Sequence, residues 1–273
     1  MPVFGFASDI HLSFYPKDQL PLIQWAPDVD VILLAGDIMD GVKSYAIDHV
    51  LRMTEGRTGL MTLGNHELYG IRRDKAVREL KRGFEGSHVT LLLNESVVID
   101  GVRIAGTDLW TDFSLMGDPT RAMGEAERSM NDYRQIRVRD SRSGFDRFRK
   151  LRPADTLQWN LDAQAFIREE LNHSSEPVVL MTHHAPDGRS VPERFRGHRL
   201  SPAYACNLSP LFEACRQVPV VNVHGHIHQS QNYQLPCGTW VLANPMGYLG
   251  HDEQTGFDPA AAFAVTADGQ FDL

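Results

Sequence analysis

Short apolar runs alternate with longer helical patterns along most of the chain. Five of the runs are rich in Val, Ile and Leu, and each leads into Gly or a polar cluster, which is typical of buried strands. They cover residues 3–10, 29–38, 59–67, 177–186 and 219–228. The stretches between them predict helices at about 17–26, 43–55, 70–83, 155–172 and 203–217. This alternation predicts an α/β sheet covered by helices.

Three further stretches predict antiparallel pairing. Residues 89–110 read as strands joined by a turn at Asp100-Gly101, a dipeptide that is typical of tight hairpins. Residues 239–248 and 261–273 are similar, and the latter contain a second turn at Asp268-Gly269. These stretches predict a second, more antiparallel sheet.

The composition narrows the class of protein. With 273 residues the chain is long enough for one α/β domain with a large core. Its 27 Lys and Arg against 35 Asp and Glu give a net charge of −8, so nucleic acid is an unlikely partner. The three cysteines, Cys206, Cys215 and Cys237, indicate reduced thiols in a cytosolic protein. The chain has no transmembrane-length apolar run and no signal-peptide pattern, so we expect a cytoplasmic protein without membrane contact.

Polar side chains gather where the five predicted buried strands end. Ligands of open α/β sheets collect at the carboxyl ends of the strands. Seven of the twelve histidines fall at these ends when His224, just before the last cluster, is included, and the groups present are carboxylates, imidazoles and an amide. Such donors suit Zn, Mn, Fe, Co or Ni. In chain order the clusters are Asp9-Ile10-His11, Gly36-Asp37, Gly64-Asn65-His66-Glu67, His183-His184 and Gly225-His226-Ile227-His228.

This ordered set resembles the motifs of the calcineurin-like metallophosphoesterases. Their pattern is D-x-H, G-D, G-N-H-[DE], a strand-terminal His and G-H-x-H, and every part is matched between residues 9 and 228. The resemblance implies a four-layer α/β/β/α sandwich, in which two mixed sheets are flanked by helices. It also implies one metallophosphoesterase domain over residues 1–273, with a two-metal site at the loop ends of the sheets.

The resemblance further implies a ligand set. One divalent ion would be held by Asp9, His11 and His228, and the other by Asn65, His183 and His226. Asp37 would bridge them, and a hydroxide shared by both ions would attack phosphorus. The identity of the two ions stays open among Mn, Fe, Zn, Co and Ni.

Three histidines need separate interpretation. By the same resemblance His66 is the non-ligand histidine of the G-N-H-E motif, and it would be catalytic at the leaving group, with Asp40 or Glu67 orienting it. We interpret His183 as the ligand, since the apolar strand runs directly into it, and place His184 at the pocket wall. His224 precedes the last motif and is interpreted as a supporting residue.

Substrate contacts are predicted less sharply. Residues 183–205 form a long connection that we expect to wall the pocket. Its arginines could grip phosphate or lie on the surface, and Tyr204 and Trp110 could stack on a ring or pack in the core. The candidate contacts are His184, Arg196 and Tyr204, then Arg189, Arg194 and Arg199, and also Asn131 and Tyr133.

The inserted segment at about 111–155 is named the basic flap. Between Arg134 and Arg152 it carries eight Lys or Arg against two Asp. Two interpretations stay open, a solvated charge-rich helix pair or a flap beside an anionic substrate.

The function predicted from the sequence is metal-dependent hydrolysis of a small or medium phosphoester by a dinuclear enzyme. Phosphodiesters and phosphomonoesters are not distinguished, and the oligomeric state is left open. The alternatives are a nuclease of the same superfamily and a non-catalytic metal-binding scaffold.

Overall fold

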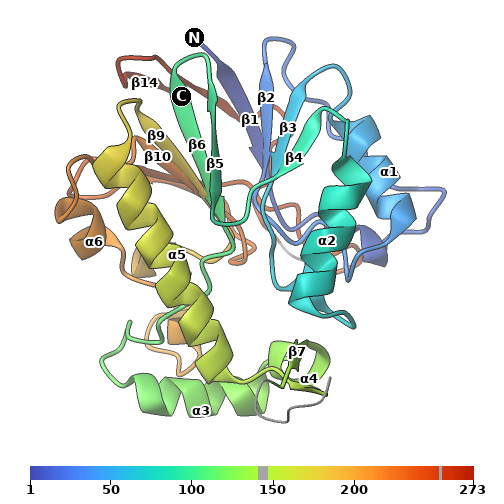
Figure 1. The fold of residues 1–273 in the computed structure, drawn as a ribbon, viewed down its shortest axis with the longest axis vertical. Helices are drawn as coiled ribbons and strands as arrows, with labels where there is room; N and C mark the ends of the chain where they lie inside the picture. The colour runs from blue at the N-terminus through green and yellow to red at the C-terminus, as the bar shows by residue number, and fades with distance from the viewer. Residues whose placement is uncertain (141–146, 252–253) are drawn as a thin grey trace.

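The computed structural model describes residues 1–140, 147–251 and 254–273, and in these residues two six-stranded sheets lie face to face (Figure 1). The central strands of both sheets are parallel. Antiparallel strands lie at both edges of the second sheet and at one edge of the first, whose other edge strand is parallel to its neighbour. The first sheet runs β14 (Phe271–Asp272), β13 (Ala262–Val265), β1 (Val3–Ala7), β2 (Val31–Leu34), β3 (Thr58–Met61) and β4 (Val89–Leu91). The second runs β11 (Gln231–Gln234), β12 (Trp240–Ala243), β10 (Val221–His224), β9 (Val178–Thr182), β6 (Val102–Thr107) and β5 (Glu95–Ile99).

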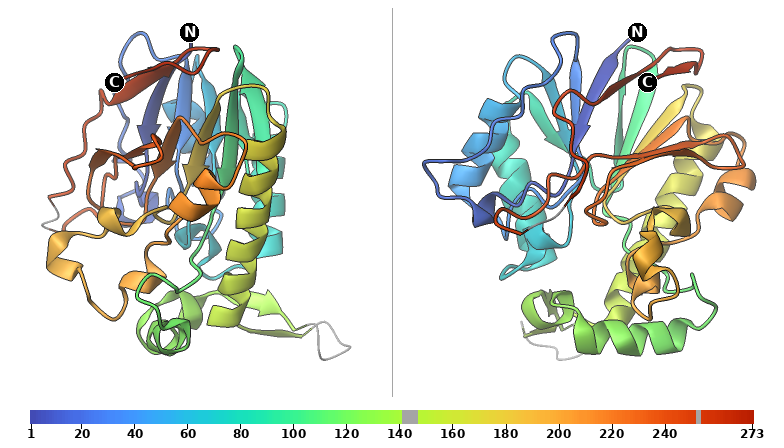
Figure 2. Two further views of the ribbon diagram at one scale, coloured as in Figure 1. Left: turned by 90° about the vertical axis from the view of Figure 1, so that its left-hand side faces the viewer. Right: turned by 180° about the vertical axis from the view of Figure 1, so that it is seen from behind.

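Helices cover the outer face of each sheet (Figures 1 and 2). The first sheet carries α1 (Ser44–Met53) and α2 (Arg73–Phe84), and the second carries α5 (Pro153–His173) and α6 (Ser209–Glu213). The predicted four-layer α/β/β/α sandwich of two mixed sheets is therefore confirmed. No helix in the described part of the chain is both long and apolar enough to cross a membrane.

The continuous apolar strands are explained by burial on both faces. Along β2, Val31 and Leu33 face the core between the sheets, whereas Ile32 and Leu34 face the helices. Each residue of this strand is at most 1% exposed, so apolar residues are favoured at every position. The central strands of such sheets consequently have continuous apolar sequences rather than alternating apolar and polar residues.

The predicted second sheet is present, but the prediction that it is more antiparallel is wrong, since each sheet has two antiparallel strand pairs. Strand β12 (Trp240–Ala243) belongs to the second sheet, while β13 (Ala262–Val265) belongs to the first. The two hairpins are present, since β5 pairs with β6 around Asp100-Gly101 and β13 pairs with β14 around Asp268-Gly269. Local turn chemistry predicts a hairpin, but it carries no information about which sheet receives it.

Two predicted helices are also wrong. Residues 17–26 are irregular, because Pro21 falls in their middle and removes a helix hydrogen bond. Ile23 and Trp25 are buried there without helical structure. Of residues 203–217 only Ser209–Glu213 is α-helical, and Pro210 in its first turn prevents an earlier start.

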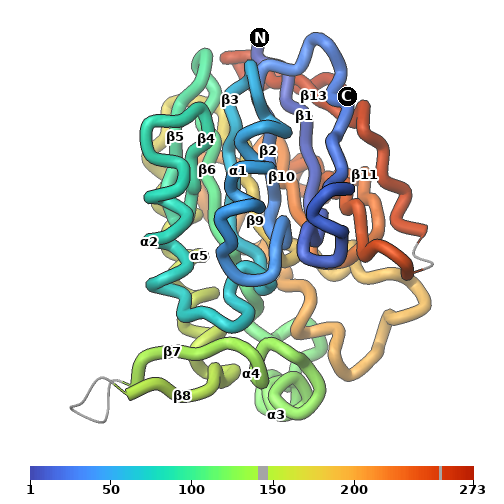
Figure 3. Tube along the Cα trace, turned by 90° about the vertical axis from the view of Figure 1, so that its right-hand side faces the viewer, coloured from blue at the N-terminus to red at the C-terminus, as the bar shows by residue number. Residues whose placement is uncertain are grey.

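The basic flap is an excursion below the two sheets (Figures 1 and 3). It contains α3 (Pro119–Ser129), α4 (Asp132–Gln135) and a small hairpin of β7 (Arg137–Arg139) and β8 (Phe148–Lys150). The helix pair, one of the two interpretations of Arg134–Arg152, is therefore wrong. The described residues form the end of a short helix followed by a hairpin. The sequence prediction also includes Arg142 and Asp146, which lie outside the described residues.

Candidate functional site

The predicted ligands meet where the two sheets come together at the carboxyl ends of their strands. Asp9 and His11 follow β1, Asp37 follows β2, Asn65 and His66 follow β3, His183 follows β9, and His226 and His228 follow β10. Each side chain starts just beyond a strand rather than within it, so the strands are shorter than the apolar runs predict. The loops at these ends are therefore free to take the conformations that the site requires.

Five of these residues have left-handed backbone conformations. The φ angles are 51° at Asp9, 50° at His11, 56° at Asp37, 68° at His226 and 52° at His228. Residues other than Gly avoid this region, at a cost on the order of 1 kcal/mol or more each. Strain of this kind concentrates at functional sites, where the surrounding fold holds it in place.

The motif glycines are required by close approach. A Cβ on Gly64 would overlap the carboxylate of Asp37 and lie 2.5 Å from its amide nitrogen. A Cβ on Gly225 would lie 2.8 Å from Asp9 Oδ2 and 2.9 Å from the carbonyl of Ala35. Gly64 lets two strand-end loops of the first sheet touch, and Gly225 lets a loop of the second sheet touch the first, which brings the ligands together.

One group of predicted ligands consists of Asp9, His11 and His228. The Nε2 atoms of His11 and His228 are 3.1 Å apart, and His228 Nε2 is 3.4 Å from Asp9 Oδ1. Burial favours protonation of Asp9, but the neighbouring His228 outweighs it and lowers the pKa of that carboxyl. Burial lowers the pKa of His11 to about 4, so its imidazole is neutral and able to bind a metal.

A second group surrounds Asp37. His183 Nε2 lies 3.3 Å from Asp37 Oδ2 and 3.0 Å from Asn65 Oδ1. Burial opposes the charged form of His183, but the Asp37 carboxylate outweighs it and raises the pKa to about 10. A metal ion bound at Nε2 would therefore displace a proton from His183. For His226, burial and then the neighbouring His184 hold the pKa well below its ordinary value.

These residues fit two divalent ions. In the described part of the chain His226 Nε2 is buried and has no hydrogen-bond partner. A buried ring nitrogen without a partner is costly, and a metal ion satisfies it. His183 Nδ1 is held 2.9 Å from the carbonyl of Ala35, which leaves Nε2 directed at Asp37 and Asn65. Outer hydrogen bonds of this type orient histidine ligands in metal sites.

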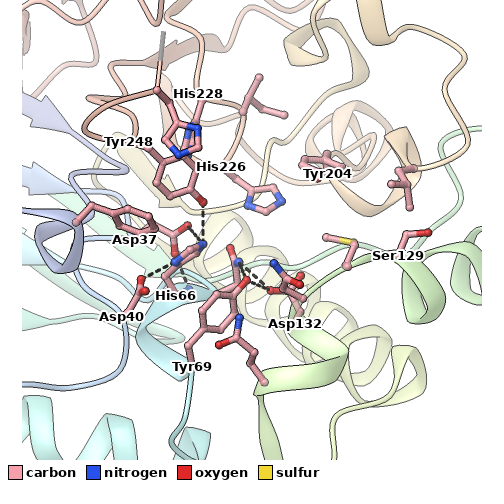
Figure 4. Close-up of a pocket in the computed structure, with 18 of the residues that line it drawn as sticks. Asp37, Asp40, His66, Tyr69, Ser129, Asp132, Tyr204, His226, His228 and Tyr248 are labelled. Carbon is pink, nitrogen blue, oxygen red and sulfur yellow. Dashed lines mark hydrogen bonds and ion pairs between the residues drawn. The ribbon is translucent and has the colours of Figure 1, made fainter. Parts of the chain in front are cut away.

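His66 sits beside these groups with both ring nitrogens engaged (Figure 4). Its Nδ1 is 2.6 Å from Asp40 Oδ1 and its Nε2 is 3.0 Å from the hydroxyl of Tyr248. Of the two candidate partners, Asp40 therefore orients His66. Glu67 instead accepts backbone N–H groups of residues 37, 38, 39 and 64, and so fixes the loops around Asp37.

His184 and His224 are both buried behind the site. The ring of His184 stacks on Trp110, with ring centroids 4.9 Å apart, and its centroid lies 4.1 Å from that of His226. His184 therefore packs against a predicted ligand, His226. It does not line the cavity, where the sequence prediction places it. His224 contacts Ser190 Oγ at 2.9 Å through Nε2, which agrees with a supporting role.

A cavity of about 870 Å³ opens over the predicted ligands. Residues 194–204 supply part of its wall, including Arg194 and Tyr204. Arg196 and Arg199 are exposed and do not line it, and Arg189 pairs with Asp187 at 3.1 Å. From the basic flap the lining residues are Ser129, Met130, Asn131, Asp132 and Gln135. The described basic residues of Arg134–Arg152 thus lie outside this cavity, and Tyr133 is buried in the core.

Two residues of the site, Tyr248 and Asp132, are not predicted from the sequence. Tyr248 stacks on His11 at 4.1 Å and contacts His66, and it follows β12 just as the motifs follow other strands. Asp132 lies between Asn131 and Tyr133, the two flap residues that the sequence predicts as candidate contacts. Its Oδ1 accepts hydrogen bonds from Asn65 Nδ2 at 2.8 Å and from the Tyr69 hydroxyl at 2.9 Å. Because the amide nitrogen of Asn65 donates to Asp132, the amide oxygen of Asn65 is turned toward His183.

We expect Asp132→Ala to weaken divalent metal binding by about 10- to 100-fold, the usual effect of losing a residue that orients a ligand. Asp132→Asn can still accept through its amide oxygen, so its loss is expected to stay below about tenfold. Calorimetric titration of Mn²⁺ into the metal-free proteins measures the metal affinity of both variants. Tyr69→Phe, which removes the other donor to Asp132, is the matched control. Equal metal affinity in Asp132→Ala and the wild type would contradict the orienting role.

Comparison with known proteins places these features in context. Residues 2–230 match the calcineurin-like phosphoesterase family. The uncharacterized protein L509 of Acanthamoeba polyphaga mimivirus is 26% identical over 211 residues, which is 72% of this chain and 70% of that protein.

Two solved structures share the fold. A phosphopantetheinyl hydrolase from Mycobacterium tuberculosis superposes with a TM-score of 0.63 at 16% identity, over 90% of each chain. A dimetal phosphatase from Danio rerio superposes with a TM-score of 0.53 at 14% identity, over 96% of this chain and 91% of that one.

Proposed function

This chain belongs to the calcineurin-like phosphoesterase family, and we propose that it is a dinuclear phosphodiesterase within it. Membership of the family makes the protein a metal-dependent phosphoesterase and therefore a hydrolase. The number of metals in use, the class of ester and the roles of individual residues are the proposal. The observation that carries the preference for diesters is the charge of the cavity wall.

The ligand assignment follows the two groups in the site. Asp9, His11 and His228 would hold one divalent ion, and Asn65, His183 and His226 the other. Asp37 would contact both, since its carboxylate lies between the groups and a carboxylate can give one oxygen to each ion. Such ions, when bound, supply positive charge against the phosphate and lower the pKa of a coordinated water so that it can act as the nucleophile.

His66 would handle the proton of the leaving group. The Asp40 carboxylate at Nδ1 favours the tautomer or ion in which Nδ1 carries hydrogen, and Nε2 faces the cavity beside Tyr248. Burial opposes a charged His66, but Asp37 and then Asp40 outweigh it and raise its pKa. A protonated Nε2 can donate to the departing oxygen, which is general acid catalysis.

The wall of the cavity favours a singly charged phosphate. Among the described lining residues, Arg194 is the one Lys or Arg, and Asp37, Asp40 and Asp132 add carboxylates. A phosphomonoester dianion is usually gripped by several cationic side chains with paired hydrogen bonds. A diester carries one charge fewer at neutral pH, and it needs no such clamp beyond the ions themselves.

Hydrolysis of two chromogenic esters tests this proposal. With Mn²⁺ added, kcat/KM for bis-p-nitrophenyl phosphate is expected to exceed that for p-nitrophenyl phosphate by at least about tenfold. A chelator should abolish both activities, and Asp37→Asn serves as the blank. Faster cleavage of the monoester would contradict the diesterase proposal while leaving the family function intact.

A further inference from the structure

A second, smaller cavity adjoins the first. Its volume is about 270 Å³, and it shares Phe195, Leu200, Tyr204 and Ile227 with the larger cavity over the predicted metal ligands. Ile227 lies directly between His226 and His228 in the chain. The smaller cavity is therefore a side pocket that begins at the site itself.

The wall of this side pocket is apolar. Val191, Pro192, Phe195, Leu200 and Ile227 form most of it. The polar groups beside them are already engaged, because the Ser201 hydroxyl donates to the carbonyl of Phe195 at 2.8 Å and His198 Nδ1 accepts from the Leu200 N–H at 3.3 Å. A ligand would thus meet mainly carbon atoms, beside the hydroxyl of Tyr204 and Nε2 of His198.

Phe195 shows that this wall is incomplete in the protein alone. Its side chain is 47% exposed, although it comes from a connection in which Val191 is 4% exposed. When a ligand covers a half-exposed aromatic ring at the mouth of an apolar pocket, burial of that apolar surface stabilises the complex. The pocket therefore favours an apolar occupant over water.

The side pocket lies away from the residue that would protonate the leaving group. The ring of Tyr204 packs on His226 at 4.8 Å, and Figure 4 shows Tyr204 on the opposite side of His226 from His66 and Tyr248. A phosphodiester has two substituents, of which one leaves. With the leaving oxygen near His66, the other substituent would point toward Tyr204 and the side pocket.

We propose that the side pocket binds an apolar or aromatic group on the substituent that stays attached to phosphorus. This inference rests on the proposed diesterase function and names the substrate class for it. A cavity of about 150 Å³ can hold benzene, so a volume of 270 Å³ admits a group larger than a single aromatic ring. The substrate is thus a phosphodiester with a bulky apolar substituent on its retained side.

Two diesters with the same leaving group test the inference. p-Nitrophenyl 2-phenylethyl phosphate and p-nitrophenyl ethyl phosphate both release p-nitrophenol, and they differ only in the ring on the retained substituent. The ring is expected to raise kcat/KM by at least about tenfold in the wild type, from burial of its apolar surface. In Phe195→Ala this ratio should fall to about threefold or less. Phe148→Ala, which removes an exposed phenylalanine of β8 outside both cavities, should leave the ratio unchanged.

Binding provides a second readout that needs no turnover. In the metal-loaded wild type, saturation-transfer NMR with 2-phenylethyl phosphate should show ring protons in contact with protein, and Phe195→Ala should weaken these signals. An equal rate for the two diesters, or a preference that persists in Phe195→Ala, would overturn the side-pocket assignment and leave the diesterase function standing. Failure to hydrolyse either diester in the presence of metal would overturn the diesterase proposal and this inference with it.

Discussion

Asp37→Asn is expected to lower turnover by at least about 10³-fold and to remove the stabilisation that divalent metal confers on the fold. The carboxylate of Asp37 lies between the two ligand groups, 3.3 Å from His183 Nε2 and 4.0 Å from His66 Nε2. Burial works against its charge, but His183 and then His66 outweigh burial and hold the pKa of Asp37 well below its usual range. The native residue is therefore an anion at neutral pH, and asparagine removes that charge while keeping the shape.

Thermal unfolding with and without Mn²⁺ measures this directly. Metal at 100 times its dissociation constant stabilises a protein by about 2.7 kcal/mol, which corresponds to a rise of roughly 5–10 °C in Tm for a domain of this size. The wild type should show that rise and Asp37→Asn should lose most of it. Asp48→Asn, which removes an exposed carboxylate of α1, is the charge-matched control and should behave as the wild type. A full metal shift in Asp37→Asn would contradict the bridging assignment.

The sequence predicts the strands and the site for the same reason. A strand buried on both faces must be apolar throughout, so the first polar residues after it mark the sheet edge where ligands gather. Asp9, Asp37 and Asn65 can be predicted in this way, since a single residue separates each of them from an apolar run. Their convergence on one point is confirmed by the distances in the structure, whereas their roles as ligands remain a proposal.

The features that the sequence does not predict depend on contacts between distant segments. Asp132 reaches Asn65 across 67 positions of the chain, and nothing in its local pattern distinguishes it from a surface carboxylate. Tyr248 is positioned by β12, whose place in the second sheet the hairpin signals could not specify. The left-handed backbone at Asp9 and His226 is equally invisible, because local preference disfavours it and only the surrounding packing maintains it.

The interpretation of charge also changes in three dimensions. The basic stretch Arg134–Arg152 left two interpretations open, a solvated charge-rich segment or a flap beside an anionic substrate, and its described cations lie outside the larger cavity. Arg149 pairs with both oxygens of Asp155 at 2.6 Å, and Arg137 donates to the carbonyl of Arg134 at 2.9 Å. The flap instead turns Asp132 toward the site. A run of one charge in sequence therefore says little about which side chains face a cavity.

His66→Gln is expected to lower kcat by about 10²- to 10⁴-fold while the protein keeps its full content of metal. Both ring nitrogens of His66 already have protein partners, Asp40 at 2.6 Å and Tyr248 at 3.0 Å, and this is the arrangement of a proton donor held by an orienting carboxylate. Metal content measured by mass spectrometry, alongside steady-state kinetics, separates this role from that of a ligand. A parallel loss of metal in His66→Gln would assign His66 to the ligand set instead.

The leaving group provides the sharper test of proton donation. A p-nitrophenolate needs little help to depart, whereas an alkoxide needs a proton, so the loss in His66→Gln should be larger for an alkyl leaving group than for p-nitrophenol. Asp40→Asn should show the same trend at a smaller amplitude, because it disturbs the orientation of His66 and keeps the imidazole. An equal loss for both leaving groups would mean that His66 stabilises charge on the phosphate without transferring a proton. Its contact with Asp40 would then serve to hold a positive ring in place beside Asp37, an electrostatic role rather than an acid one.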